Sequence, residues 1–577
     1  MLKATKNNDN SVVSAIRKSR HIFYGVIGFS LFTSILMLTG PLYMLQVYDR
    51  VLASGSIPTL IALTLLILVL YMGFGVLEWV RNSILSRVGS RFEDILSDET
   101  FAATLGQTLS DPGRTHDKPL RDLRLLRRFI SSPAVTAAFD APYSLVFFLI
   151  LFLIHPLYGL LAVFGGVVLV GIAFVNQKLT NQAMREAEGL ENAAQMQVRE
   201  VTQNAEIIEA LGMSERVQTR WRDKFDRSDA ALVSSASLLG RFVSGTKAFR
   251  MFLQSSVLGL GAYLSIIGVS TPGAMIAASI ITGRAIGPLE QLVGQWRMVT
   301  SAKVAWEALS ALLDGETEKQ DMMELPEVEG KISVEGVSAG PPGASKAFLT
   351  GLNFVIEKGD TIGLIGPSAA GKSMLARLLV GIWPAQVGTV RIDGADMKSW
   401  PRKALGPQIG YLPQQVDLFS GPIKENICRF EKDADAKDVI AAAKAAGCHD
   451  MILRLPDGYD TEIGERGAYL SAGQRQRVGL ARALYGAPAI IVMDEPNANL
   501  DNDGETALQA AIKSLKEQGT TVVLIAHRPS TIVQCNKLLM LEGGKVRAFG
   551  PREEVLAKVA PKSTGGVSLL RKGEKRG

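Results

Sequence analysis

Residues 366–373 carry the clearest chemical pattern in the chain, Gly-Pro-Ser-Ala-Ala-Gly-Lys-Ser. Two glycines five positions apart, followed by a lysine and a hydroxyl residue, fit the phosphate-loop pattern. Glycines let the backbone turn so that N–H groups point at phosphate oxygens, and the helix start that follows adds partial positive charge. We expect Lys372 to meet the β- and γ-phosphates of a nucleoside triphosphate and Ser373 to ligate Mg²⁺. The expected nucleotide contacts in this loop are Gly366, Pro367, Ser368, Ala369, Ala370, Gly371, Lys372 and Ser373.

The segments on either side of the loop support the same interpretation. Residues 361–365 are apolar and predict a buried strand, and residues 374–379 begin a helix. A strand, a loop and a helix in this order are the context that a phosphate loop requires. The alternative is a glycine-rich turn that fits the pattern by chance, and the matching context argues against it.

Two carboxylates follow a second predicted strand. The apolar run at residues 489–493 ends in Asp494 and Glu495. A carboxylate at a strand end can hold a magnesium shell from the side opposite Ser373, so we assign Asp494 to the metal. Glu495 would then orient or deprotonate the attacking water, which makes it the predicted catalytic base. Solvated acids at an ordinary strand end are the alternative.

A second anion-binding helix start is predicted at residues 470–474, Leu-Ser-Ala-Gly-Gln, which precede a helical run. Ser471 and the backbone of Gly473 are the natural phosphate ligands there, and we include Gln474 among the nucleotide contacts. A simple helix cap is the alternative.

His527 and Gln414 complete the predicted site. His527 ends the strand-like run at residues 520–526, shortly after the strand that carries Glu495. Neighbouring strand ends of an α/β sheet line one crevice, so we expect His527 to contact the γ-phosphate and to act in catalysis. Gln414 follows another strand, in a loop from which it could bind nucleotide and magnesium. A solvated loop residue would be the plainer interpretation of Gln414 taken alone.

The composition indicates a chain that is part membrane protein and part soluble enzyme. Hydrophobic residues make up 47% and the mean hydropathy is +0.18, although 20% of residues are charged. The net charge of +6 is modest, so it does not argue for nucleic acid, and it suits an anionic membrane surface. The three cysteines, Cys428, Cys448 and Cys535, lack metal-ligand spacing and indicate a reducing compartment rather than a disulfide framework.

The first half of the chain predicts six membrane spans, and buried helices of a large soluble protein are the alternative. Uncharged runs long enough to cross a bilayer occupy residues 22–45, 57–77, 141–177 and 251–283, the last two broken at His155-Pro156 and at 271–273. Positive flanks such as those at residues 17–20 place these ends in the cytoplasm. No signal peptide is expected before the first span.

Domain boundaries follow from the same pattern. Charged stretches with helical spacing at residues 81–140 and 178–250 predict helices that extend beyond the membrane. Beyond residue 330, strand-like and helical stretches alternate, as in an α/β domain. The expected parts are a cytoplasmic lead (1–20), a six-span all-α domain (21–313), a linker (314–329), an α/β nucleotide-binding domain (330–560) and a basic, disordered tail (561–577).

Together these residues resemble the ATP-binding cassette (ABC) family, and the resemblance covers nearly the whole chain. It implies a type I exporter fold, ATP hydrolysis, and ATP and Mg²⁺ as cofactors. In this family the matching elements are the phosphate loop, a glutamine loop at Gln414, a signature at 470–474, a Walker B pair at Asp494 and Glu495, a D-loop at 499–501 and a switch histidine at His527. Residues 461–467 are similar to the exporter-specific loop.

One membrane half with one cassette is a half-transporter, so the resemblance implies a homodimer. The signature of one copy would close over the phosphate loop of the other. One chain cannot easily fold Ser471 back onto its own γ-phosphate, which favours the same arrangement.

Two positions depart from the family pattern. Ala472 stands in the signature where Gly is usual, and Pro341 stands where exporters carry an aromatic residue that stacks on adenine. Base contacts would then be weaker or come from elsewhere, with Phe348 as a candidate.

Within the exporters, residues 41–52 and the Asp-Ala-Pro at 140–142 are similar to bacterial type I secretion ATPases of the protease and RTX-protein (PrtD-type) branch. This resemblance implies export of unfolded polypeptide with a C-terminal signal across the inner membrane. It also implies a periplasmic membrane-fusion adaptor and an outer-membrane tunnel protein as partners. Nucleic acid is not an expected partner, because six membrane spans rule out the ATPases that act on it. An N-terminal cysteine peptidase is not expected, because the first 427 residues contain no cysteine.

Two other functions stay open at this point. A lipid or drug exporter on the same fold is the runner-up. An ATP-gated channel or regulator is disfavoured by the intact Glu495 and His527, which gating by binding alone would not need.

Overall fold

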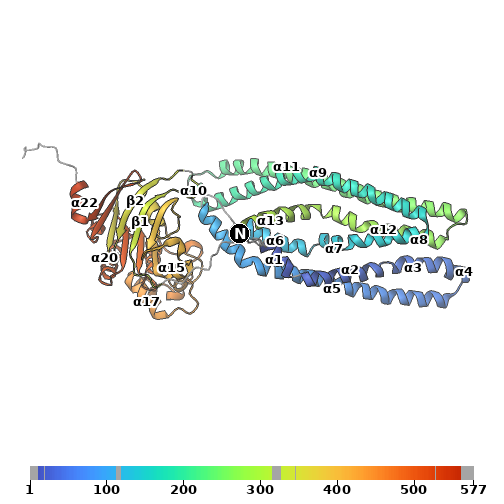
Figure 1. The fold of residues 1–577 in the computed structure, drawn as a ribbon, viewed down its shortest axis with the longest axis horizontal. Helices are drawn as coiled ribbons and strands as arrows, with labels where there is room; N and C mark the ends of the chain where they lie inside the picture. The colour runs from blue at the N-terminus through green and yellow to red at the C-terminus, as the bar shows by residue number, and fades with distance from the viewer. Residues whose placement is uncertain are drawn as a thin grey trace, which may run out of the picture. The chain divides into compact units, whose positions relative to one another are not determined.

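The computed structural model describes residues 11–18, 20–111, 118–314, 326–344, 346–526 and 528–559. The chain divides into two compact units, one of residues 1–106 with 115–318 and one of residues 107–114 with 319–577 (Figure 1). The cytoplasmic lead up to residue 10, most of the expected linker and the basic tail lie outside the described residues.

The first unit is helical. Its elements are α1 (Ser11–Lys18), α2 (Arg20–Leu36), α3 (Thr39–Gln46), η1 (Val47–Val51), α4 (Leu52–Ser54), α5 (Ile57–Ser110), α6 (Lys118–Ile130), α7 (Pro133–Asp140), η2 (Ala141–Tyr143), α8 (Ser144–Ile154), α9 (Pro156–Gln203), α10 (Ala205–Ala210), α11 (Ser214–Ile266), α12 (Pro272–Gly294) and α13 (Trp296–Asp314).

Within the described residues of this unit, four helical segments are long and apolar enough to cross a membrane. They are Arg20–Ser54, Ile57–Ser110, Pro133–Ile154 and Pro156–Gln203. The helices expected as spans five and six are α11 and α12, which do not belong to that set of four. The predicted breaks are present. His155 caps α9 by accepting a hydrogen bond from the Leu157 N–H at 3.2 Å, and Thr271 caps α12 by accepting from the Ala274 N–H at 3.1 Å.

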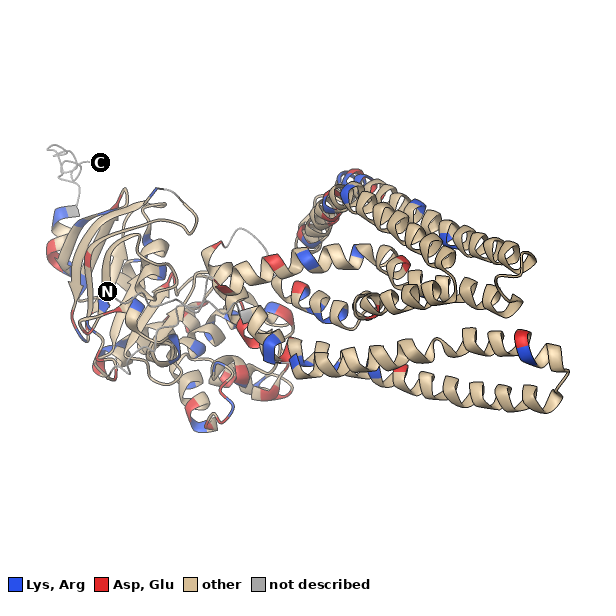
Figure 2. Cartoon of the chain, turned by 45° about the vertical axis from the view of Figure 1, so that its right-hand side comes forward, with Lys and Arg blue, Asp and Glu red and all other residues tan. Residues whose placement is uncertain are grey.

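Three helices continue far past their apolar runs. α5, α9 and α11 contain 54, 48 and 53 residues. At about 1.5 Å per residue each is roughly 70 to 80 Å long, well over the hydrocarbon thickness of about 30 Å. Figure 2 shows these helices mostly tan toward one end and marked blue and red toward the other, which fits an apolar span joined to a polar extension.

The two motifs that resemble type I secretion ATPases tie helices together. Asp49, in the π-helical turn η1, accepts from the Thr271 hydroxyl at 2.6 Å and from the Gly273 N–H at 2.9 Å, so it caps α12 from the first hairpin. Asp140, at the end of α7, accepts from the buried guanidinium of Arg81 on α5 at 2.7 Å. Both carboxylates therefore fix contacts between helices that are distant in the sequence.

The second unit is an α/β domain. Its strands are β1 (Ile332–Ala339), β2 (Leu349–Ile356), β3 (Thr361–Ile365), β4 (Val387–Ile392), β5 (Ala395–Asp396), β6 (Ile409–Leu412), β7 (Ile490–Asp494), β8 (Thr521–Ile525), β9 (Lys537–Glu542) and β10 (Lys545–Pro551). Its helices are α14 (Lys372–Leu379), η3 (Met397–Ser399), α15 (Arg402–Gln408), α16 (Ile423–Ile427), α17 (Ala436–Ala445), α18 (His449–Leu453), η4 (Gly458–Asp460), η5 (Glu465–Gly467), α19 (Ala472–Leu484), α20 (Asn502–Glu517), α21 (Pro529–Ile532) and α22 (Arg552–Val559).

These strands form two sheets. The smaller sheet has the order β2-β1-β4-β5 and the larger one the order β10-β9-β3-β8-β7-β6. In the larger sheet β3 runs parallel to β8 and β9, and β7 runs parallel to β6 and β8. The parallel strands therefore end at one edge, which is the edge that carries the predicted site.

Apolar cores cover both faces of the larger sheet, as the side-chain alternation along β7 shows. Ile490 and Val492 pack with α14 and the smaller sheet, whereas Ile491 and Met493 pack with α17, α19 and α20. Burial on both faces explains why this strand reads as a continuous apolar run in the sequence. The strand expected at 361–365 is β3, with the same bounds. The strand expected at 489–493 is β7, shifted by one residue to 490–494, and the strand expected at 520–526 is β8, which is one residue shorter at each end.

Candidate functional site

The phosphate loop connects β3 to α14 and depends on its glycines. Gly366 has φ +144°, and a Cβ there would stand 2.1 Å from the Leu541 carbonyl oxygen. Gly371, with φ +100°, caps α14. L-residues rarely adopt such angles, so both positions require glycine for the loop to close against the sheet. Between them, Pro367, Ser368 and Ala369 are exposed while Ala370 is buried.

Lys372 lies across the centre of this loop. Its ammonium group donates to the carbonyl oxygens of Gly366 and Pro367, both at 2.9 Å, and the residue is 7% exposed. The pKa of Lys372 is lowered, because the effect of burial outweighs the opposite effect of the nearby charges on Glu495 and Asp494. The loop therefore holds the Lys372 ammonium group close to two carboxylates. Phosphate oxygens of a bound triphosphate could replace the two carbonyl oxygens as acceptors of its hydrogen bonds.

Asp494 ends β7 and is almost fully buried, at 1% exposure. Burial raises the pKa of this carboxyl, and a hydrogen bond from the Ser373 hydroxyl lowers it. Its Oδ1 has no hydrogen-bond partner among the described residues. An unpartnered buried carboxylate oxygen beside a hydroxyl suits a hard cation such as Mg²⁺, so Asp494 and Ser373 fit the metal role predicted for them.

Glu495 lies at the start of the turn after β7, with φ +50° and a half-buried side chain. The amide of Gln414 donates to its Oε2 at 3.1 Å. These two residues are 81 positions apart and meet because β6 and β7 are parallel neighbours. The loop of Gln414 is thereby joined directly to the predicted base, which gives Gln414 a contact that its own sequence context did not indicate.

The signature stretch forms the start of α19. Ser471 caps the helix by accepting from the Gln474 N–H at 3.3 Å, and the Gln474 side chain accepts from the Ser471 N–H at 2.8 Å. This reciprocal pair is a capping box. Gly473 lies against Asn499, because a Cβ on it would stand 2.8 Å from the Asn499 carbonyl oxygen. The helix cap considered as the alternative is therefore present, and the exposed Ser471 still leaves this helix start open to a ligand.

The D-loop segment is tied to the same helix. Arg477 donates to both carboxylate oxygens of Asp501 at 3.0 Å, and Asp501 caps α20 through the Gly504 N–H. Hydrogen bonding from that N–H lowers the pKa of Asp501. Gln476, which is buried, donates to the Pro496 carbonyl oxygen at 3.2 Å. The signature helix and the segment after Glu495 are thus one connected body.

The sequence analysis missed two residues beside the site, and one residue that it predicted lies outside the described part of the chain. Arg377, one helical turn after Ser373, lowers the pKa of Asp494, and its i+4 spacing from Ser373 was a usable signal. Gln476, a buried amide within a charged helical run, was the other. His527 lies outside the described residues, so its role stays a prediction.

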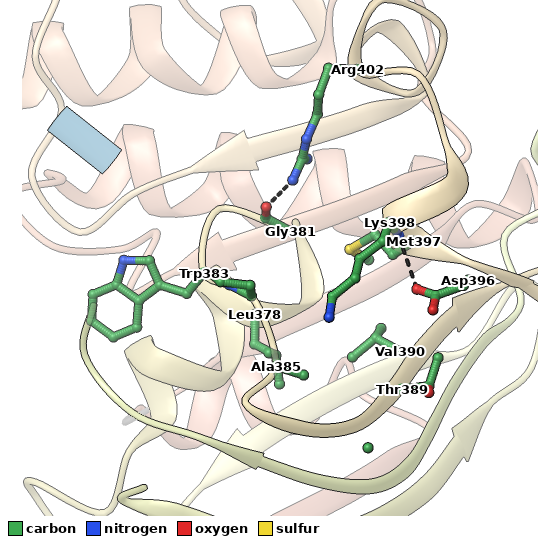
Figure 3. Close-up of a pocket in the computed structure, with 12 residues that line it drawn as sticks. Leu378, Gly381, Trp383, Ala385, Thr389, Val390, Asp396, Met397, Lys398 and Arg402 are labelled. Atoms are coloured by element: carbon green, nitrogen blue, oxygen red, sulfur yellow. Dashed lines mark hydrogen bonds between the residues drawn. The ribbon is translucent and has the colours of Figure 1, made fainter. Parts of the chain in front are cut away.

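A separate hollow lies beyond the far end of α14 (Figure 3). Its volume is about 80 Å³, and its lining residues fall between Leu378 and Arg402. The Arg402 guanidinium donates to the Gly381 carbonyl oxygen, and the Lys398 N–H donates to Asp396 at 2.9 Å. Because the phosphate loop is at the opposite end of α14, this hollow is not part of the nucleotide site.

Comparisons with known protein families match both halves of the chain. The model for the ABC transporter transmembrane region covers residues 23–289, and the ABC transporter model covers residues 349–498.

Individual proteins are similar over nearly the whole chain. The type I secretion system ATP-binding protein PrsD of Rhizobium meliloti (strain 1021) is 42% identical over 97% of this chain and 96% of its own length. The leukotoxin translocation ATP-binding protein LktB of Pasteurella haemolytica-like sp. (strain 5943B) is 31% identical over 94% of this chain and 77% of its own length. Among solved structures, a bacterial Atm1-family ABC exporter with ATP bound matches with TM-score 0.81 at 24% identity, covering 93% of this chain and 96% of that one.

Proposed function

The chain belongs to the ABC transporter family, and from that membership we propose that it exports unfolded polypeptide across the bacterial inner membrane, as the ATP-hydrolysing component of a type I secretion system. The observation that carries this proposal is the 42% identity to PrsD, which extends over both the membrane half and the nucleotide half. A likeness confined to the cassette would support ATP hydrolysis alone.

The nucleotide site supports a specific division of labour. Residues 366–373 would hold the triphosphate, and Ser373 with Asp494 would hold Mg²⁺, which neutralises phosphate charge when bound. The Oδ1 of Asp494, which has no hydrogen-bond partner within the described part of the chain, supports that assignment. Glu495 would leave its hydrogen bond with Gln414 and take a proton from the attacking water. Because Gln414 lies on a loop, its release could couple nucleotide binding to movement elsewhere in the chain.

The active form would be a homodimer with two composite ATP sites. Ser471 is exposed, its side chain takes part in the capping box, and Gly473 lies against Asn499. Further along the same helix, Gln476 and Arg477 donate to Pro496 and Asp501. A second copy could bring its own Ser471 and helix start to the phosphate loop of the first. The further proposed partners are a periplasmic adaptor, an outer-membrane tunnel protein, the cargo and the surrounding bilayer. The nucleotide domain would lie in the cytoplasm.

ATPase activity of the purified, reconstituted protein tests the cargo. The candidate cargo is an unfolded protein with a C-terminal secretion signal, compared with the same protein lacking the signal, with phospholipid and with drug-like molecules. We expect stimulation by the intact cargo and its loss when the signal is removed. Stimulation by lipid or drug alone would overturn polypeptide export and favour the runner-up function on the same fold.

A further inference from the structure

Phe348 is an exposed aromatic residue beside the phosphate loop. It lies directly before β2, and 42% of its surface is exposed although it sits next to a packed core. A Cβ on Gly371 would stand 3.0 Å from Phe348 Cε1 and 3.3 Å from Cδ1. One side of the ring therefore contacts Gly371, the residue that caps α14, and part of the side chain stays accessible to solvent.

The backbone at Phe348 is held in place from two sides. Its N–H donates to the Ala339 carbonyl oxygen at the end of β1, at 2.9 Å. Two residues further on, the Thr350 N–H donates to the Gly544 carbonyl oxygen in the turn between β9 and β10, also at 2.9 Å. A Cβ on Gly544 would stand 2.0 Å from the Phe348 carbonyl oxygen, so that turn packs directly on this residue. The ring consequently projects from a fixed backbone, with little conformational freedom to lose when a ligand binds.

Pro341, at the position where the family resemblance implies an aromatic residue, offers no comparable surface. It lies in an exposed turn after β1 and has a saturated ring, without a π face on which a base could stack. Phe348 lies seven residues further along the chain, at the loop itself.

We propose that Phe348 is the platform on which the nucleotide base or its ribose rests, in place of an aromatic residue at position 341. This inference rests on triphosphate binding at residues 366–373, and it is independent of the nature of the cargo. A phenyl ring supplies stacking and apolar contact but no hydrogen bond to the base edge. The platform should therefore accept adenine and guanine almost equally, since every base has a π face.

The competing interpretation gives Phe348 a purely structural role, in which the ring supports the phosphate loop through its contact with Gly371. A ligand that lacks a base distinguishes the two roles of Phe348. Tripolyphosphate can occupy the loop but cannot reach a base platform. A structural defect weakens both ligands, whereas loss of the platform weakens ATP alone.

The test measures ATP and tripolyphosphate affinity for the full-length protein in detergent, with the variants Phe348→Leu, Phe348→Trp and Pro341→Ala. We expect Phe348→Leu to weaken ATP binding about tenfold, as for loss of one stacked ring, and to leave tripolyphosphate binding unchanged. Phe348→Trp should preserve ATP affinity, Pro341→Ala should match the unmodified protein, and GTP should bind within a few-fold of ATP.

Three outcomes would overturn the proposal. Equal weakening of ATP and tripolyphosphate by Phe348→Leu would assign the ring a structural role. Unchanged ATP binding would remove Phe348 from the site, and a tenfold loss with Pro341→Ala would return the base to position 341. Failure of the unmodified protein to bind ATP would instead refute the proposed function, so the two failures can be told apart.

Discussion

Replacing Glu495 by Gln should stop ATP turnover while ATP binding survives. Gln has the same length as Glu, and its side-chain oxygen can still accept the hydrogen bond that Gln414 donates at 3.1 Å. The backbone at this position has φ +50°, and Gln suffers the same strain there as Glu. The substitution therefore removes the ability to accept a proton and one negative charge beside Lys372 and Asp494, while it keeps the length of the side chain and its hydrogen bond.

The two expected magnitudes differ enough to be measured separately. Loss of a general base slows hydrolysis by about 10²- to 10⁴-fold, or about 3 to 5 kcal/mol of activation free energy. Exchange of one charge-assisted hydrogen bond for a neutral one changes stability or binding by about 1 kcal/mol. ATP affinity should thus change by roughly fivefold or less.

The assay combines single-turnover ATP hydrolysis with ATP binding by the same preparation. Glu517→Gln is a matched control, because it makes the same chemical change at an exposed position at the end of α20. Hydrolysis by Glu495→Gln within tenfold of the unmodified rate would refute the base assignment. Loss of ATP binding to the same extent as turnover would show that Glu495 holds the site together rather than acting on water.

Three further predictions concern the composite ATP site, the buried carboxyl of Asp494 and the helix cap at Asp49. Lys372→Ala and Ser471→Arg should each abolish ATPase activity, but co-expressed chains should form mixed dimers with one intact composite site and regain activity. No recovery in those mixed dimers would mean that each site is built within one chain. Burial raises the pKa of Asp494 above its ordinary value of 3.8. The folded protein therefore binds the carboxyl proton of Asp494 more tightly than the unfolded chain does, and ionisation of this carboxyl at higher pH lowers the free energy of unfolding. Asp494→Asn should therefore raise the Tm of the nucleotide-free protein at about pH 8, and this gain should shrink toward about pH 4. The same variant should lose the further rise in Tm that Mg²⁺ gives to the ATP-bound protein. A lower Tm than that of the unmodified protein at high pH would contradict this. Asp49→Ala should lower the stability of the helical unit by about 1 to 2 kcal/mol, because α12 loses its carboxylate cap; Asp49→Asn should recover part of the loss, and melting in detergent can compare them.

Much of the nucleotide site could be predicted because its parts are local. Gly366 and Gly371 set a loop geometry within eight residues, and the apolar runs before it and before Asp494 identify buried strands without reference to the rest of the fold. The helix breaks at His155 and Thr271 could also be predicted from local sequence, because proline follows each of these residues. In the structure each of them caps the helix that begins there. The membrane runs likewise follow from length and composition, although α11 and α12 are not among the four described segments that are long and apolar enough to cross a membrane.

Only the tertiary structure decided which distant residues meet. The pairing of β6 with β7 brings Gln414 to Glu495, and a shift of β6 by one residue in that register would turn its side chains to the other face of the sheet. The approach of the first hairpin to α12 lets Asp49 accept a hydrogen bond from Gly273, and the turn between β9 and β10 packs on the backbone of Phe348, whose ring lies beside Gly371. The sequence by itself determined the loop, the strands and the apolar runs, because backbone preference and periodicity act over a few residues. Contacts across 81 or 224 positions depend on how complete elements pack, and no local pattern encodes that packing.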